Sequence, residues 1–190
     1  MFVFAYGSLM YEPERPDALR SVRPARLPGL VRRFNKRSRA RGCARHLAAE
    51  PRDVEGFVDG AHRVSLALGT VPGAGLDGLL LAYAPDAADD VLARLAAREG
   101  PGYRRSEVVV EVDGAACAAV TWLTDPDSGL VVELDLAAQA RVLAAATPRQ
   151  RGERALGADY LHGVQRALGA HGLRDPYVDA LVGLVTGGDG

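Results

Sequence analysis

Cysteine and lysine are scarce in this chain of 190 residues. The two cysteines, Cys43 and Cys117, lie far apart and form no CxxC pair. This argues against a disulfide framework and fits free thiols in a reducing compartment. Lys36 is the only lysine, so nearly all of the positive charge is carried by arginine.

Long apolar runs are also missing. No stretch of about 18 apolar residues is present, so no membrane span is expected. The N-terminus lacks a basic leader followed by a long apolar stretch, so no signal peptide is expected either. The formal net charge of −1 gives the whole molecule no bias toward polyanions. We therefore expect a cytoplasmic protein.

Metal-binding patterns are absent as well. The histidines form no HxxxH or HExxH pattern, and the cysteines are not spaced to join them. We therefore expect no metal site. The four histidines are His46, His62, His162 and His171.

Two known functional motifs do not hold up in this sequence. Ser8 lies in "YGSLM" and not in GxSxG, so the nucleophile elbow is not met, although a serine nucleophile with a distant histidine stays open. The letters "GAGLDG" at residues 73–78 fit GxGxxG, but a strand-like "LLLAYA" follows where a dinucleotide site needs a helix. A glycine-rich hairpin turn is the preferred interpretation.

The order of the expected elements indicates the fold class. Hydrophobic residues make up 48% of the chain and charged residues 25%, which is typical of a globular protein. We expect one domain over residues 1–190, with α+β order and a small mixed, mostly antiparallel β-barrel flanked by helices. The expected strands are 2–6, 25–38, 63–68, 78–84, 106–112 and 115–124, with a hairpin turn at Asp113-Gly114. The expected helices are 85–100, 135–146, 153–170 and 175–185, and residues 39–62 are predicted to form a surface loop.

The opening segment "FVFAYGSLMYEP" combines a buried strand, a Gly7-Ser8 break and a predicted helix start at Glu12 and Pro13. Backbone N–H groups at such a turn are available to bind an anion such as a carboxylate.

Glu99 lies at the end of the predicted helix 85–100, where the helix dipole disfavours a carboxylate. The following Gly-Pro-Gly forces a sharp turn that can direct the side chain into a cleft. Apolar walls there would raise its pKa toward the range a general acid/base needs. The alternative is a surface glutamate paired with Arg98 or Arg104.

The stretch "RRFNKRSRARGCAR" at residues 32–45 is strongly basic. Such a run can bind nucleic acid, with steep dependence on salt, but on a neutral chain it is more often a solvated edge or a small anion site. We expect no nucleic-acid partner.

Two motifs resemble those of a known family. "VFAYGSLM" is similar to the YGSL loop of the γ-glutamylcyclotransferase superfamily, and "LAAREGPGYRR" at residues 95–105 resembles the ChaC-type stretch in which a glutamate precedes Gly-Tyr-x-Arg. "LVRRFNKRS" looks like the family's second strand. Residues 156–185 resemble its closing helix pair with an internal tyrosine.

The resemblance implies an enzyme of the carbon–nitrogen lyase or acyltransferase class. It would release 5-oxoproline from a γ-glutamyl amide, such as glutathione, with no metal or organic cofactor. Glu99 matches the position of the general acid/base. The binding residues implied by the match are Tyr6, Gly7, Ser8, Leu9, Tyr103 and Tyr160.

The resemblance does not define the substrate as closely as it defines the reaction. Tyr11 replaces a tryptophan frequent in the ChaC motif, and the leaving amine stays open among Cys-Gly, an amino acid and another amine. Arg33, Asn35 and Ser38 either line the cleft or face water. A homodimer is left open, and the alternative function is an inactive relative that binds a small anion or a protein partner.

Overall fold

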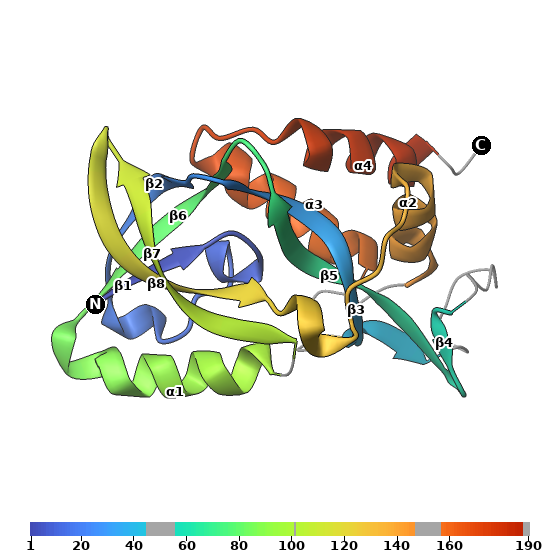
Figure 1. Cartoon of the computed structure of the whole chain (residues 1–190), viewed down its shortest axis with the longest axis horizontal. Coiled ribbons are helices and arrows are strands. Elements are labelled where there is room, and N and C mark those ends of the chain that lie inside the picture. The colour runs from blue at the N-terminus through green and yellow to red at the C-terminus, as the bar shows by residue number, and fades with distance from the viewer. Residues whose placement is uncertain (45–55, 101, 147–156, 188–190) are drawn as a thin grey trace.

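The computed structural model describes residues 1–44, 56–100, 102–146 and 157–187. Its strands form a closed five-stranded barrel and a separate three-stranded sheet (Figure 1). In pairing order the barrel consists of β1 (Phe2–Ala5), β6 (Leu76–Tyr83), β2 (Leu19–Leu27), β7 (Tyr103–Val112) and β8 (Ala115–Thr124). The second sheet consists of β3 (Leu30–Ala44), β5 (His62–Pro72) and β4 (Val58–Asp59).

The helices lie on two sides of these sheets (Figure 1). On one side α1 (Ala88–Glu99) runs along the barrel, with Val91 and Leu95 buried and acidic residues in its first turn. On the other side three helices pack together against β3 and β5. These are α2 (Leu136–Ala145), α3 (Gly157–Ala170) and α4 (Pro176–Gly187).

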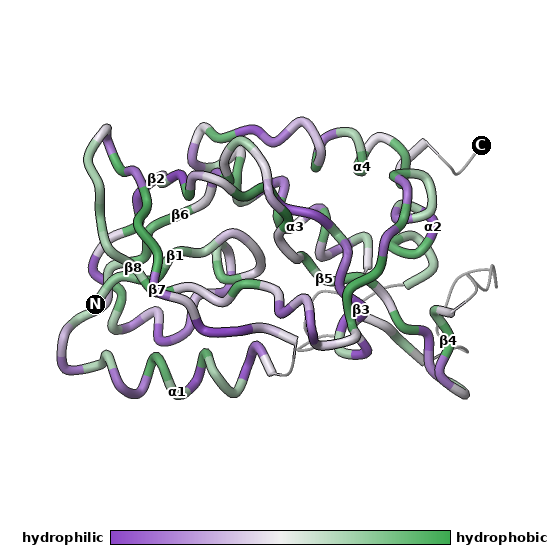
Figure 2. Tube along the Cα trace, viewed as in Figure 1, coloured by the Kyte–Doolittle hydropathy of each residue, from purple (hydrophilic) through white to green (hydrophobic). Residues whose placement is uncertain are grey.

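The barrel has the mixed pairing expected from the sequence. β1 pairs antiparallel with β6 and meets β8 in parallel at Val3 and Val120, while the other barrel pairs are antiparallel. Figure 2 shows that β6 is largely hydrophobic where it crosses the barrel. Such a continuous apolar run is typical of a strand covered on both faces. The predicted α+β barrel flanked by helices is therefore confirmed.

Several local predictions are confirmed by the backbone. The β7–β8 hairpin turns at Asp113 and Gly114, whose φ angles are 50° and 79°, as a type I′ turn requires. The helix predicted at 85–100 is a short 3₁₀ turn, Pro85–Ala87, followed by α1, and it ends at Gly100 with a φ of 62°. Local signals determine these elements because each is formed by contiguous residues.

Three predictions are wrong or incomplete. The glycine-rich turn after Pro72 is not a hairpin, because β5 belongs to the second sheet while β6 belongs to the barrel. No helix begins at Glu12 and Pro13; 3₁₀ turns form at Ser8–Met10 and Pro16–Ala18, with Arg15 between them in the left-handed region.

The surface loop predicted at 39–62 is the third correction. β3 continues to Ala44, and β4 and the start of β5 also fall within that range; residues 45–55 lie outside the described part. The pairing register of β3 with β5 shifts between Phe34 and Lys36 and again between Ser38 and Cys43. Such bulges break the two-residue alternation from which a strand is recognised. The beginning of the helix predicted at 153 also lies outside the described residues, and its described part starts at Gly157.

A buried arginine joins the two sheets to the C-terminal helix. Arg32 of β3 donates through Nη1 to Asp175 Oδ2 at 2.8 Å, and through Nη2 to the backbone carbonyl of Asp77 in β6. Asp175 in turn precedes α4, and its Oδ1 accepts from the backbone N–H of Tyr177 at 3.0 Å. This contact fixes the second sheet against the barrel, and so fixes the space between them.

Candidate active site

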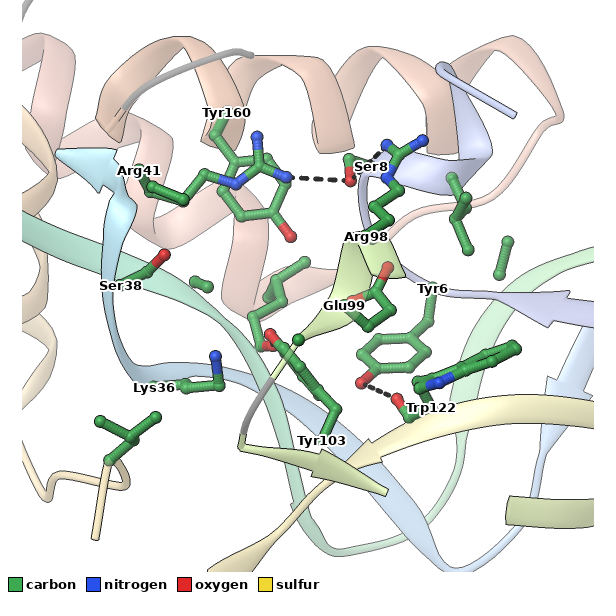
Figure 3. Close-up of a pocket in the computed structure, with 18 of the residues that line it drawn as sticks. Tyr6, Ser8, Lys36, Ser38, Arg41, Arg98, Glu99, Tyr103, Trp122 and Tyr160 are labelled. Atoms are coloured by element: carbon green, nitrogen blue, oxygen red, sulfur yellow. Dashed lines mark hydrogen bonds between the residues drawn. The ribbon is translucent and has the colours of Figure 1, made fainter. Parts of the chain in front are cut away.

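A cavity of about 370 Å³ lies where the barrel meets the second sheet. Its walls come from the turn after β1, the middle of β3, the junction of α1 with β7, and α3 (Figure 3). This volume is within the range of small-molecule sites. All seven residues singled out from the sequence line it: Tyr6, Gly7, Ser8, Leu9, Glu99, Tyr103 and Tyr160.

The turn after β1 forms one wall. Gly7 leads into the 3₁₀ turn Ser8–Met10, and a Cβ on Gly7 would lie 3.0 Å from the hydroxyl of Tyr160. Glycine therefore allows close packing of the turn against α3. The Ser8 hydroxyl oxygen accepts hydrogen bonds from Arg41 Nη2 and Arg98 Nη2, each at 3.0 Å.

Two guanidinium groups thus meet at Ser8. Arg98 comes from the last turn of α1, and its side chain is almost fully buried; it forms ion pairs with Glu14 at 2.8 Å and with Glu12 at 3.6 Å. Arg41 comes from β3 and lies 4.0 Å from the centre of the Tyr160 ring. This end of the cavity is consequently rich in fixed hydrogen-bond donors that suit a carboxylate.

Glu99 is the last residue of α1 and is half-buried on the cavity wall. In Figure 3 its carboxylate lies beside Tyr6, near the turn that carries Ser8. Of the two arginines named as alternative partners from the sequence, Arg98 pairs with Glu14 at 2.8 Å and Arg104 pairs with Asp125 at 2.7 Å. The sharp turn at Gly100 places Glu99 at the cavity, where its charge acts on the surrounding ionisable groups.

Two tyrosines face Glu99 with their rings. Burial raises the pKa of Tyr6 and of Tyr103 well above the ordinary value, and the charge of Glu99 raises both further. Both hydroxyls therefore stay protonated near neutral pH. They donate to the fold itself, Tyr6 to the carbonyl of Trp122 at 2.7 Å and Tyr103 to that of Leu68 at 2.6 Å. These bonds hold the rings as rigid walls of the cavity.

Comparison with known proteins identifies the family. A family model described as ChaC-like protein matches residues 1–187. The chain belongs to the ChaC-like family. A search of curated proteins finds no match for this ChaC-like protein.

Solved structures resemble the ChaC-like chain over nearly its whole length. A γ-glutamyl cyclotransferase specific to glutathione, from yeast, has 18% identity and a TM-score of 0.76, over 98% of this chain and 96% of that one. A second structure of such a yeast enzyme has 18% identity and a TM-score of 0.74, covering 100% and 99%. YkqA from Bacillus subtilis has 17% identity and a TM-score of 0.56, over 98% of this chain and 54% of that one. At these identities the likeness shows the fold.

The basic stretch of the ChaC-like protein is partly internal. Arg32, Lys36 and Arg41 are buried, and the latter two line the cavity. Of the three residues left open from the sequence, Ser38 lines the cavity. Arg33 packs 4.5 Å from the centre of the Tyr177 ring, and Asn35 is buried outside the lining. The stretch therefore offers less positive charge at the surface than its number of basic residues suggests.

Sequence reasoning missed Lys36, Arg41 and Arg98 as cavity residues. Their orientation depends on the bulged pairing of β3 and on the packing of α1, neither of which is local. One sequence signal could have drawn attention to this strand as part of the cavity: Lys36 is the single lysine in an arginine-rich chain.

The described ranges of the ChaC-like protein contain neither a metal-ligand cluster nor a membrane-spanning helix. No three His, Cys, Asp or Glu side chains there come together as a metal site. None of the helices there is long and apolar enough to cross a membrane.

Proposed function

We propose that this ChaC-like protein is a γ-glutamylcyclotransferase. In the proposed reaction the α-amine of a γ-glutamyl amide attacks its own γ-carbonyl carbon, and the bond from that carbon to the amide nitrogen breaks. The products are 5-oxoproline and the free amine. The nucleophile belongs to the substrate, so the protein has to hold the substrate in a shape ready for attack and to transfer protons.

One observation carries the proposal: Glu99 and the Tyr6–Leu9 turn face the same cavity. A glutamyl head held at that turn lies next to a carboxylate. Glu99 accepts a proton from the α-ammonium group, which frees the amine to attack, and returns a proton to the leaving nitrogen. Over the whole reaction two protons move from the attacking nitrogen to the leaving nitrogen, and Glu99 ends as it began.

The α-carboxylate of the glutamyl head is assigned to the cluster of Ser8, Arg41 and Arg98. The two guanidinium groups that meet at Ser8 supply charge-assisted hydrogen bonds at the end of the cavity next to Glu99. Binding there turns the α-amine and γ-carbonyl toward Glu99. The same cluster supports the alternative function, an inactive relative that binds a small anion.

A product screen separates these functions. The purified protein is incubated with glutathione, γ-glutamylalanine and γ-glutamylethylamide, and 5-oxoproline is measured by mass spectrometry. We expect 5-oxoproline from at least one substrate, at a rate proportional to protein concentration. If none of the three yields it while one still binds by calorimetry, the protein is a binding relative and the proposed activity is wrong.

A further inference from the structure

Lys36 occupies an unusual position for a lysine. It is the only lysine of the chain, it is 6% exposed, and it lines the cavity from β3. Its Nζ lies 4.2 Å from the centre of the Tyr103 ring. Within the described residues its ammonium has this ring contact and no hydrogen bond or ion pair. A buried ammonium is costly unless an anion accompanies it, so this position favours a negatively charged ligand group.

Lys36 lies at the far end of the cavity from Arg98, although Arg37, Arg39 and Arg41 of its own strand also line the cavity. In Figure 3 Ser8 and Arg98 lie at one end of the labelled side chains, and Lys36 lies at the other, next to Tyr103. Arg98 is held by Ser8, Glu12 and Glu14, and Arg41 by Ser8 and Tyr160. The cavity therefore has Arg98 at one end and Lys36 at the other, with the Glu99 carboxylate on the wall between them in this view.

This arrangement suits a substrate with a carboxylate at each end. If the glutamyl head occupies the Ser8 end and its scissile bond lies at Glu99, the leaving group extends toward β3. We propose that Lys36 binds a carboxylate of the leaving amine, so that the substrates are γ-glutamyl amino acids or peptides and not γ-glutamyl alkylamines. This inference rests on the proposed function.

The surroundings of Lys36 agree with that role. Burial lowers the pKa of Lys36, the nearby charge of Glu99 raises it, and the charge of Arg41 lowers it. A bound carboxylate would act in the same direction as Glu99 and keep the ammonium charged. The Tyr103 ring beneath the ammonium restricts its position, and the Tyr103 hydroxyl is itself fixed on the carbonyl of Leu68.

A matched pair of substrates tests the proposal. γ-Glutamylalanine and γ-glutamylethylamide differ only in the carboxylate of the leaving amine. The kcat/KM for 5-oxoproline release is measured with both for the wild type, for Lys36→Met, and for Arg33→Met. Arg33 is a cation of the same strand that packs on Tyr177 outside the cavity.

We expect the wild type to prefer γ-glutamylalanine. Lys36→Met should lower kcat/KM for γ-glutamylalanine by about 10- to 100-fold, as the loss of a charge-assisted hydrogen bond implies. Its kcat/KM for γ-glutamylethylamide and its denaturation midpoint should change little, which shows an intact fold. Arg33→Met should leave both substrates unaffected.

Each other outcome has a distinct meaning. An equal loss on both substrates would show that Lys36 acts through Glu99, and would overturn the proposal. No loss on either, or no preference in the wild type, would overturn it while leaving the cyclotransferase function standing. If the wild type releases no 5-oxoproline from either substrate, the proposed function fails and this inference fails with it.

Discussion

Glu99→Gln is expected to lower kcat for 5-oxoproline release by about 10²- to 10⁴-fold, the usual contribution of a general acid/base. Glutamine keeps the size and the hydrogen-bonding capacity of the side chain but cannot take up and return a proton. Glu99 ends α1, where the helix dipole disfavours a negative charge. The free energy of unfolding should therefore stay equal or rise slightly. Steady-state kinetics and urea denaturation measure the two quantities on the same preparation.

The matched control for this variant is Glu107→Gln. Glu107 is exposed on β7 and does not line the cavity, so its replacement should leave both activity and stability unchanged. If Glu99→Gln turns over γ-glutamyl substrates at the wild-type rate, Glu99 is not the acid/base. If it loses activity only together with its fold, the residue is structural.

Asp175→Ala is expected to lower the free energy of unfolding by about 3–5 kcal/mol, because it leaves the Arg32 guanidinium buried without its anion. The Arg32 side chain is fully buried, and burial lowers its pKa. The same substitution removes the side-chain cap of α4, where Asp175 Oδ1 accepts from the backbone N–H of Tyr177. Equilibrium denaturation in guanidinium chloride measures this loss in the free energy of unfolding. The kinetics of 5-oxoproline release are measured at a temperature well below unfolding.

Two further variants divide this effect into its parts. Asp175→Asn keeps an oxygen for the helix cap but removes the charge, so its cost should be smaller than that of alanine but still clear. Asp86→Ala, at an exposed aspartate in the 3₁₀ turn before α1, should cost at most about 1 kcal/mol. A loss below about 1 kcal/mol for Asp175→Ala would contradict the view that this ion pair joins β3 to α4.

Much of the fold could be predicted because its signals are local. The Asp113-Gly114 turn, the acidic start of α1 and the glycine at its end are each contained in a few consecutive residues. Barrel closure could not be predicted in the same way, because β1 meets β8 more than a hundred residues further along the chain. The full length of β3 was missed because its bulges interrupt the alternation of buried and exposed residues.

The residues of the candidate site also divide into those with a local sequence signal and those placed by long-range pairing. Glu99 and the Tyr6–Leu9 turn could be singled out because each lies in a short segment with its own chemical pattern. Arg41 and Lys36 could not, since their approach to the cavity depends on how β3 pairs with β5. For Tyr6 and Tyr103 the resemblance implied only that they bind the substrate. The hydrogen bonds to Trp122 and Leu68 leave the rings as the cavity surface.

The identity of the first product formed from γ-glutamylalanine, in water enriched in the heavy oxygen isotope, tests the central claim most directly. Attack by the substrate's own amine predicts equal amounts of alanine and 5-oxoproline, with no heavy oxygen in the 5-oxoproline. Release of glutamate carrying the heavy isotope would show that water is the nucleophile, and would contradict the account.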